Sequence, residues 1–171
     1  MAKNDTVNFS VSVTPIELLA TENAGTESIL ASEVGKSLGG SGTANVASYA
    51  GSAADQGYKD AAVNYISCLD DSSTQISAET SASFVMIKNT GYYFDSATTL
   101  GSVATEHIVV TTENTRSTVI ASLGPGEAFV LKALQATKTI DCTKIHVQTF
   151  EANGSAAGAT DHLATEYLVV D

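Results

Sequence analysis

The clearest structural signal in this chain is HIVVTTENTRSTVIASLGPGEAFVLKAL, residues 107–134. Runs of β-branched and apolar residues alternate here with short polar sequences, a pattern typical of consecutive antiparallel strands. Glu113-Asn114-Thr115-Arg116 is a candidate hairpin connection. Gly124-Pro125-Gly126-Glu127 predicts a type II turn, because Pro125 presets its own φ and Gly126 accepts a positive φ. The stretch therefore predicts strands at 107–112, 118–123 and 128–134.

Similar runs occur on both sides of this stretch. They predict further strands at 62–69 (AVNYISCL), 84–88 (FVMIK), 144–150 (KIHVQTF) and 167–170 (YLVV). Asp70-Asp71-Ser72-Ser73 follows the first of them and Asn89-Thr90-Gly91 follows the second. Because Asp, Asn, Ser and Gly favour turns, each of these two sequences is predicted to end its strand.

The N-terminal third is less regular. Apolar and polar residues alternate over 7–13 and predict a strand that ends before Pro15, with Val7, Phe9, Val11 and Val13 on one face. Residues 27–36 are predicted to form a short helix. In 36–57, 14 of 22 residues are Gly, Ser or Ala. This segment is either an extended arm on a neighbouring surface, anchored by Tyr49 and Tyr58, or a flexible loop.

These runs predict an all-β protein. About eight or nine strands, spaced at about 8–20 residues, leave no room for a long helical period. We expect an antiparallel β-sandwich of jelly-roll type, with a long Gly/Ser/Ala-rich N-terminal arm or insertion. Residues 1–171 should form a single domain, because dividing the chain in two would leave pieces too small to bury good cores. Residues 15–60 should be a region rich in loop or arm.

The composition narrows the function. The formal net charge is −11, from 19 acidic and 8 basic residues, which argues against nucleic acid and against an anionic membrane as partners. Ala, Thr, Ser and Gly together supply 77 of the 171 residues, and there is no Trp. Small neutral side chains of this kind suit close subunit contacts, so the composition favours a structural or packing protein.

The sequence lacks the features expected of a secreted or membrane-spanning protein, which favours a reducing compartment. The opening MAKNDTVNFSVSV has no continuous apolar run of a signal peptide, and no run of about 18 apolar residues follows. Cys68 and Cys142 are 74 residues apart and are interpreted as two free buried thiols, with a disulfide as the alternative. The sequons at Asn4, Asn8 and Asn153 are then chance matches in a chain rich in Thr and Ser.

Motifs with chemical meaning are weak. Gly35-Lys36-Ser37 lacks the earlier glycine of a phosphate-binding loop, since Leu30 stands there. His107, His146 and His162 lack the close spacing of zinc ligands. The acidic corner Asp70-Asp71 suggests a bound cation, or simply a turn. No nucleophile motif is present, so we expect no enzyme and assign no catalytic, cofactor-binding or metal-binding residue.

The second half of the chain nevertheless resembles a known class of proteins. The resemblance lies in the following runs, which span roughly residues 80–171: FVMIKNTG (84–91), HIVVT (107–111), LGPGEAFVL (123–131) and ATEYLVV (164–170). Their order is similar to that in small β-sandwich structural proteins of tailed-phage virions, including capsid decoration (cement) proteins. The first 80 residues carry no such resemblance.

The resemblance implies a passive role. A protein of this class binds the outer surface of the phage head, contacts the major capsid protein, stabilises capsomer contacts and is often a dimer or trimer. It would be assembled in the host cytoplasm and located on the virion. The alternatives are a tail, baseplate or fibre-associated virion protein, and a carbohydrate-binding module in which Tyr49, Tyr58, Tyr92 and Tyr93 stack on sugars.

Overall fold

The computed structural model describes residues 5–13, 16–18, 28–30, 38–46, 65–69, 72–114, 118–133, 138–155, 157–158 and 161–170. Within these ranges the regular structure is β-strand, apart from a 3-10 turn at Cys142–Lys144, so the predicted all-β class is confirmed. No helix among the described residues is long and apolar enough to cross a membrane. The chain divides into two compact units, Thr6–Asn45 and Met1–Asp5 with Val46–Asp171, which are described separately.

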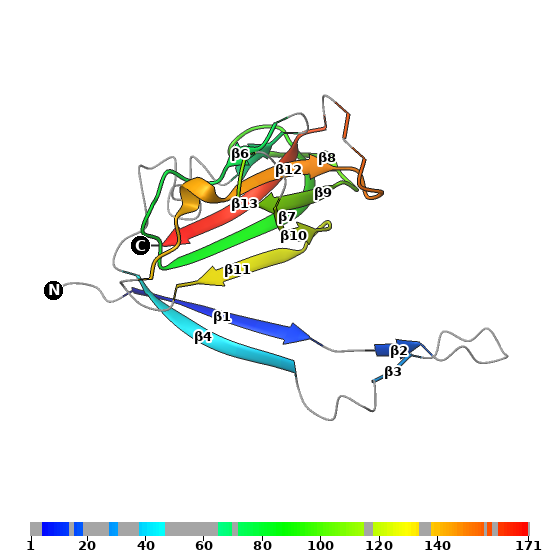
Figure 1. Cartoon of the computed structure of the whole chain (residues 1–171). Coiled ribbons are helices and arrows are strands. Elements are labelled where there is room, and N and C mark those ends of the chain that lie inside the picture. Colours follow the sequence, from blue (N-terminus) through cyan, green and yellow to red (C-terminus); the bar gives the residue numbers. More distant parts are fainter. Residues whose placement is uncertain are drawn as a thin grey trace. The chain divides into compact units, whose positions relative to one another are not determined.

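The larger unit contains two antiparallel sheets (Figure 1). Its described strands are β5 (Tyr65–Cys68), β6 (Thr74–Gln75), β7 (Phe84–Phe94), β8 (Leu100–Val103), β9 (His107–Thr111), β10 (Val119–Leu123), β11 (Ala128–Lys132), β12 (His146–Phe150) and β13 (Leu163–Val170). One sheet has the order β10-β9-β12-β6, and the other has the order β11-β7-β13-β5, with β8 added to β7. The short strands β6 and β8 are not evident in the sequence.

Strand pairing in this unit is nested. Among the described strands of the unit, the first pairs with the last, β5 with β13, and the next two inward pair likewise, β6 with β12 and β7 with β11. The innermost pair is the β9–β10 hairpin. Strands that are neighbours in the sequence therefore fall mostly in different sheets, and the pairing bonds are long-range.

Both sheets contribute to one hydrophobic core. Alternate residues of each strand point inward, as in Val85 and Ile87 of β7, Ile108 and Val110 of β9, and Val147 of β12, and all five are completely buried. Tyr167 and Val169 of β13 join the same cluster. Full burial of one such aliphatic side chain contributes about 1.5–3 kcal/mol, so this period-two pattern supplies much of the driving force for a β-sandwich-like arrangement.

The turn predicted at 124–127 is confirmed. The Glu127 amide donates to the Gly124 carbonyl at 3.0 Å, and Gly126 has φ +81°. The Glu127 carboxylate accepts a second hydrogen bond within the turn, from the Gly124 amide at 2.7 Å. This geometry is the type II pattern that Pro at the second position and Gly at the third position favour.

The turn predicted at Asn89-Thr90-Gly91 is wrong. These residues lie inside β7, where the register with β13 shifts and produces a bulge. Gly91 has φ +77°, and its amide donates to Asn89 Oδ1 at 2.9 Å. The sequence resembles a turn because a bulge needs the same residues, but the ladder continues on both sides.

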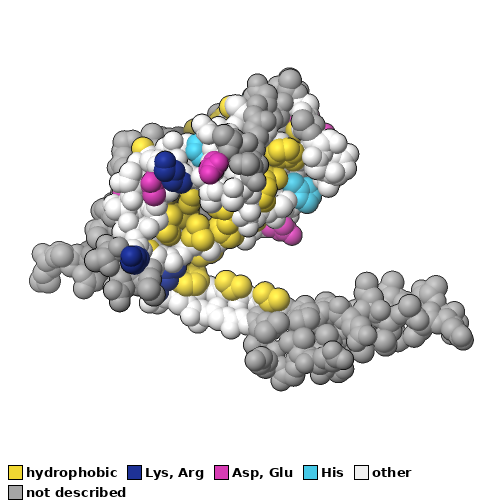
Figure 2. All heavy atoms as spheres, in the orientation of Figure 1, with side chains coloured by type: hydrophobic (Ala, Val, Ile, Leu, Met, Phe, Trp, Pro, Cys, Tyr) yellow, Lys and Arg dark blue, Asp and Glu magenta, His cyan; other side chains and the backbone are white. Residues whose placement is uncertain are grey.

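The described residues of the smaller unit form two two-stranded sheets. Strand β1 (Asp5–Val13) pairs with β4 (Leu38–Val46), and β2 (Ile16–Leu18) pairs antiparallel with β3 (Ser28–Leu30). We call the β1–β4 pair the ribbon. The predicted strand at 7–13 is confirmed, and Figure 2 shows hydrophobic side chains in a row along the ribbon.

Two expectations for this region need correction. Residues 28–30 of the predicted 27–36 helix form strand β3, because pairing with β2 outweighs a weak local helical pattern. Residues 38–46 of the Gly/Ser/Ala segment form strand β4, and 47–57 lie outside the described residues. Glycine is required at Gly39 of β4, where a Cβ would be 2.7 Å from the Val11 carbonyl oxygen. A Cβ on Gly42 would be 2.7 Å from the Phe9 ring, so the ring would have to move.

Candidate functional site

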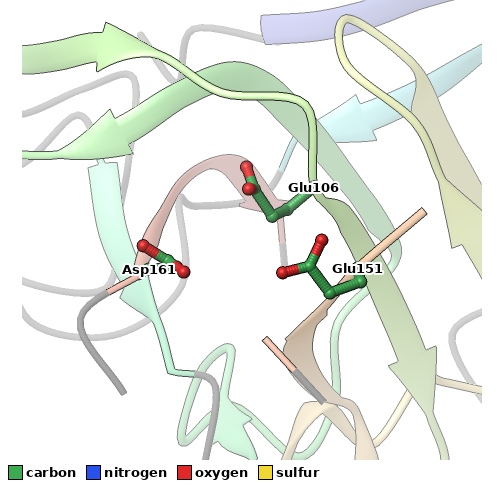
Figure 3. Close-up of side chains that lie close together, drawn as sticks. All are labelled: Glu106, Glu151 and Asp161. Carbon is green, nitrogen blue, oxygen red and sulfur yellow. The ribbon is translucent and has the colours of Figure 1, made fainter. Parts of the chain in front are cut away.

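The strongest cluster of chemical groups in the described residues is acidic. Glu106, Glu151 and Asp161 each offer a carboxylate oxygen, and these oxygens all lie within 4.8 Å of one another. Figure 3 shows the three side chains converging from three different segments. We call this group the carboxylate cluster.

Strand register brings the cluster together. His107 of β9 pairs with Phe150 of β12, so Glu106, just before β9, and Glu151, just after β12, meet at the same end of one sheet. Asp161 comes two residues before β13 begins in the other sheet. The cluster thus lies where both sheets end.

Hydrogen bonds hold Glu106, which is only 6% exposed. Its Oε1 accepts a hydrogen bond from the Tyr93 hydroxyl at 2.9 Å, and its Oε2 accepts one from the Thr105 amide at 2.9 Å. Asp161 Oδ2 accepts from the Gly158 amide at 3.1 Å. Because the Tyr93 hydroxyl donates to Glu106, and because burial and the nearby negative charges act in the same direction, the pKa of Tyr93 rises to about 12. Tyr93 therefore remains a donor throughout the physiological pH range.

The cluster consists only of carboxylate oxygens, the type of ligand that hard cations such as Ca²⁺ and Mg²⁺ prefer. Glu151 and Asp161, together with the remaining lone pairs of Glu106, could hold such an ion. Both oxygens of Glu106 already have protein donors, however, so the cluster also has a structural role in linking the end of β7 to the start of β9.

A shallow hollow of about 230 Å³ lies beside the cluster, on the outer side of the β10-β9-β12 sheet. Val109, Val119 and Phe150 supply its apolar lining, and His107 and Glu151 its polar lining. Val119 is 58% exposed. The hollow is smaller than the roughly 300–1,000 Å³ of most small-molecule sites, so its open apolar surface suits a protein contact better than an enclosed ligand.

The histidines do not form a site. His107 and His146 lie at opposite ends of the β9–β12 pair, because His107 pairs with Phe150 and His146 pairs with Thr111. His146 Nδ1 is instead 3.5 Å from the Ser73 hydroxyl. Among the described residues, no group of three side chains suited to a metal includes a histidine.

The tyrosines proposed for sugar stacking are separated. Tyr92 is 38% exposed and pairs with Val103, which is 71% exposed, on the neighbouring strand β8. Tyr93 packs against the core and bonds Glu106. Adjacent residues of a strand point to opposite faces, so these two rings do not make one platform. Tyr49 and Tyr58 lie outside the described residues.

Both cysteines are free and buried, so the prediction of two unpaired thiols is confirmed. Burial raises the pKa of both Cys68 and Cys142 to about 12. The thiolate is the reactive form, so neither cysteine is suited to nucleophilic chemistry.

The carboxylate cluster was not recognised in the sequence. Each acid lies just outside a strand, and this position identifies a site only when the pairing of the strands is known. The cation corner Asp70-Asp71 and the Gly35-Lys36-Ser37 motif both lie outside the described residues. Comparison of the chain with protein-family models, with curated proteins and with solved structures found no match.

Proposed function

We propose that the chain is a capsid decoration (cement) protein of a tailed-phage virion, built on a jelly-roll domain. It binds the outer surface of the head, contacts the major capsid protein and stabilises the contacts between capsomers. The observation that carries this proposal is the nested pairing of the larger unit. Jelly rolls of two four-stranded sheets recur in viral capsid proteins and lectins.

Nested pairing supports the jelly-roll assignment in detail. Wrapping one long hairpin into two sheets leaves its arms paired in order, first with last, as β5·β13, β6·β12, β7·β11 and β9·β10 are here. The two sheet orders, β11-β7-β13-β5 and β10-β9-β12-β6, follow from that wrapping. Strand β8 is then a local addition to β7.

The ribbon supports an assembly role. A two-stranded hairpin is at best marginally stable in water by itself. Val11 and Val13 are 49% and 52% exposed, and residues 6–13 and 38–46 contain no charged side chain. Exposed strand edges in natural proteins usually carry charges that prevent pairing. A ribbon with exposed valines, in which Asp5 at the start of β1 is the one charged residue, is suited to packing on another subunit, of the shell or of a second copy.

Binding to shells tests the proposal. Heads prepared without outer proteins are mixed with the purified full chain at increasing salt, and bound protein is measured after sedimentation. We expect saturable binding that persists at high salt, because apolar and backbone contacts are not screened as surface ion pairs are. Failure to bind at any salt concentration would contradict the proposal.

A matched pair of variants tests the ribbon. Removing two valines with Val11→Ser and Val13→Ser should weaken binding by at least about tenfold, since burial of two such side chains contributes more than about 1.4 kcal/mol. Ser12→Thr changes an exposed position of the same strand and should leave binding unchanged. Equal binding by all variants would show that the ribbon is not part of the interface.

The alternatives give different results. A tail, baseplate or fibre protein would be present in far fewer copies than the shell protein. A carbohydrate-binding module would retain glycans on an array, where a decoration protein should retain none.

A further inference from the structure

The loop after β12 contains the only Asn-Gly pair of the chain, Asn153-Gly154. Residues 152–155 are all exposed, and a Cβ built on Gly154 would have no heavy atom within 4 Å. Gly154 has φ +84°, a conformation that favours glycine. The Asn153 side chain is therefore exposed, and no side chain on residue 154 separates it from the backbone nitrogen that follows.

Two hydrogen bonds have opposite effects on attack of the Gly154 nitrogen at Asn153 Cγ: one favours the attack and the other opposes it. The Ser155 amide donates to Asn153 Oδ1 at 2.8 Å. Negative charge would build on that oxygen if a nucleophile attacked Cγ, so the donor stabilises the transition state as an oxyanion hole does. The Gly154 amide donates to the Glu151 carbonyl at 2.8 Å, and this bond must open before the nitrogen can attack.

We propose that Asn153 is a site of spontaneous deamidation in the folded protein. Solvent base removes the Gly154 amide proton, and the nitrogen attacks Asn153 Cγ. The Cγ–Nδ2 bond breaks, Nδ2 takes a proton and leaves as ammonia, and a five-membered imide remains. Water then opens the imide at either carbonyl, giving aspartate or isoaspartate, with no change in oxidation state.

The product adds one negative charge to a chain of formal charge −11, two residues from Glu151 of the carboxylate cluster. Like charges near one another oppose folding, so conversion should weaken this end of the two sheets. Isoaspartate also inserts an extra backbone carbon into the turn that Glu151 and Ser155 close, where the Glu151 amide donates to the Ser155 carbonyl at 3.0 Å.

The test follows the folded full chain at neutral and mildly alkaline pH by peptide mapping and mass spectrometry, with an enzymatic assay for isoaspartate. A parallel sample is kept in urea. We expect conversion at Asn153 that accelerates with pH and is at least as fast in the native protein as in urea, while the buried Asn89 stays intact. No conversion in the native protein, with conversion in urea, would show that the turn protects Asn153 and would overturn the proposal.

Two variants check the chemistry. Asn153→Gln should lose the signal, because its longer side chain would have to close a larger ring. Gly154→Ala should slow conversion by more than about tenfold, equivalent to about 1.4 kcal/mol in the barrier, because a side chain crowds the attacking nitrogen. Unchanged conversion in both variants would assign the mass change to another residue and contradict the proposal.

Discussion

Asn89 is the polar residue on which the bulge in β7 depends. It is completely buried, and its Nδ2 donates to the carbonyls of Glu106 and Leu123 at 3.1 and 3.0 Å while Oδ1 accepts from Gly91. We expect Asn89→Ala to destabilise the larger unit by about 2–4 kcal/mol, because three buried polar groups lose their partner. Thermal unfolding should shift down by about 5–15 °C.

An exposed asparagine provides the control for this measurement. Asn114→Ala, in the connection after β9, should change stability by less than about 0.5 kcal/mol. A similar loss in both variants would contradict the role assigned to Asn89.

Tyr93 gives the carboxylate cluster a pH dependence. Its pKa is raised to about 12 from 10.0, so the folded state favours the neutral phenol. The resulting stability is fully present below pH 10 and is lost as pH rises towards 12. Tyr93→Phe should cost about 1–2 kcal/mol at neutral pH, because Glu106 Oε1 loses its donor. Urea unfolding at several pH values should show the difference from wild type shrinking above pH 10, and a constant difference would argue against this assignment.

Glu151 tests the repulsion inside the same cluster. With carboxylate oxygens within 4.8 Å, Glu151→Gln should raise stability by up to about 1 kcal/mol at low salt. Salt should shrink this gain, since it screens partly exposed charges. A loss of stability in the variant would mean that Glu151 makes a favourable contact instead.

At the level of elements, the β7 bulge and the 124–127 turn form one joint. The Gly126 amide donates to the Asn89 carbonyl at 2.9 Å, and the Asn89 amide donates to the Glu127 carbonyl at 3.0 Å. A Cβ on Gly91 would also be 3.1 Å from Pro125 Cβ. The turn after β10 is therefore held directly against the bulge, across a large separation in sequence.

Substitutions at two glycines in this joint distinguish the conformational cost of a positive φ from the cost of crowding a neighbour. Gly126→Ala should cost about 1–2 kcal/mol from positive φ alone, because no atom lies within 4 Å of the new Cβ. Gly91→Ala carries the same φ penalty and in addition crowds Pro125, so it should cost more. Denaturant midpoints of the two variants give the comparison, and equal losses would rule out a packing contribution at Gly91.

The sequence predicted elements wherever the signal was local. Strands β9, β10 and β11 and the Pro125-Gly126 turn all follow from β-branched runs and turn chemistry. Asn89-Thr90-Gly91 was misassigned because its positive φ is supported by Pro125 and by the neighbouring strands, which no local pattern reveals. Strand β4 was missed because Gly39 and Gly42 look like a loop until Val11 and Phe9 are placed against them.

At the scale of the whole molecule, topology limited the prediction of the site. Glu106 and Glu151 are 45 residues apart and meet only because β9 and β12 pair across two intervening strands. Alternation within each strand predicts which residues face the core, but not which strands are neighbours. The nested pairing, on which the proposed function depends, likewise becomes visible only in the folded chain.

The distribution of charge over the chain is also a property of the whole molecule. A formal net charge of −11 opposes nonspecific association between copies of the chain and with nucleic acid. The ribbon residues 6–13 and 38–46, which contain no charge, are where another subunit could pack without that repulsion. If the chain acts by assembly, we therefore expect this ribbon to contribute strongly to the contact with a shell or a second copy.

The most direct test is the abundance of the chain in purified virus particles, measured by quantitative mass spectrometry against the major capsid protein. A decoration protein on the outer surface should be present at a copy number comparable with that of the shell protein. It should also be removable by protease while the shell stays intact. Absence from the particle, or the low copy number of a tail component, would contradict the proposed function.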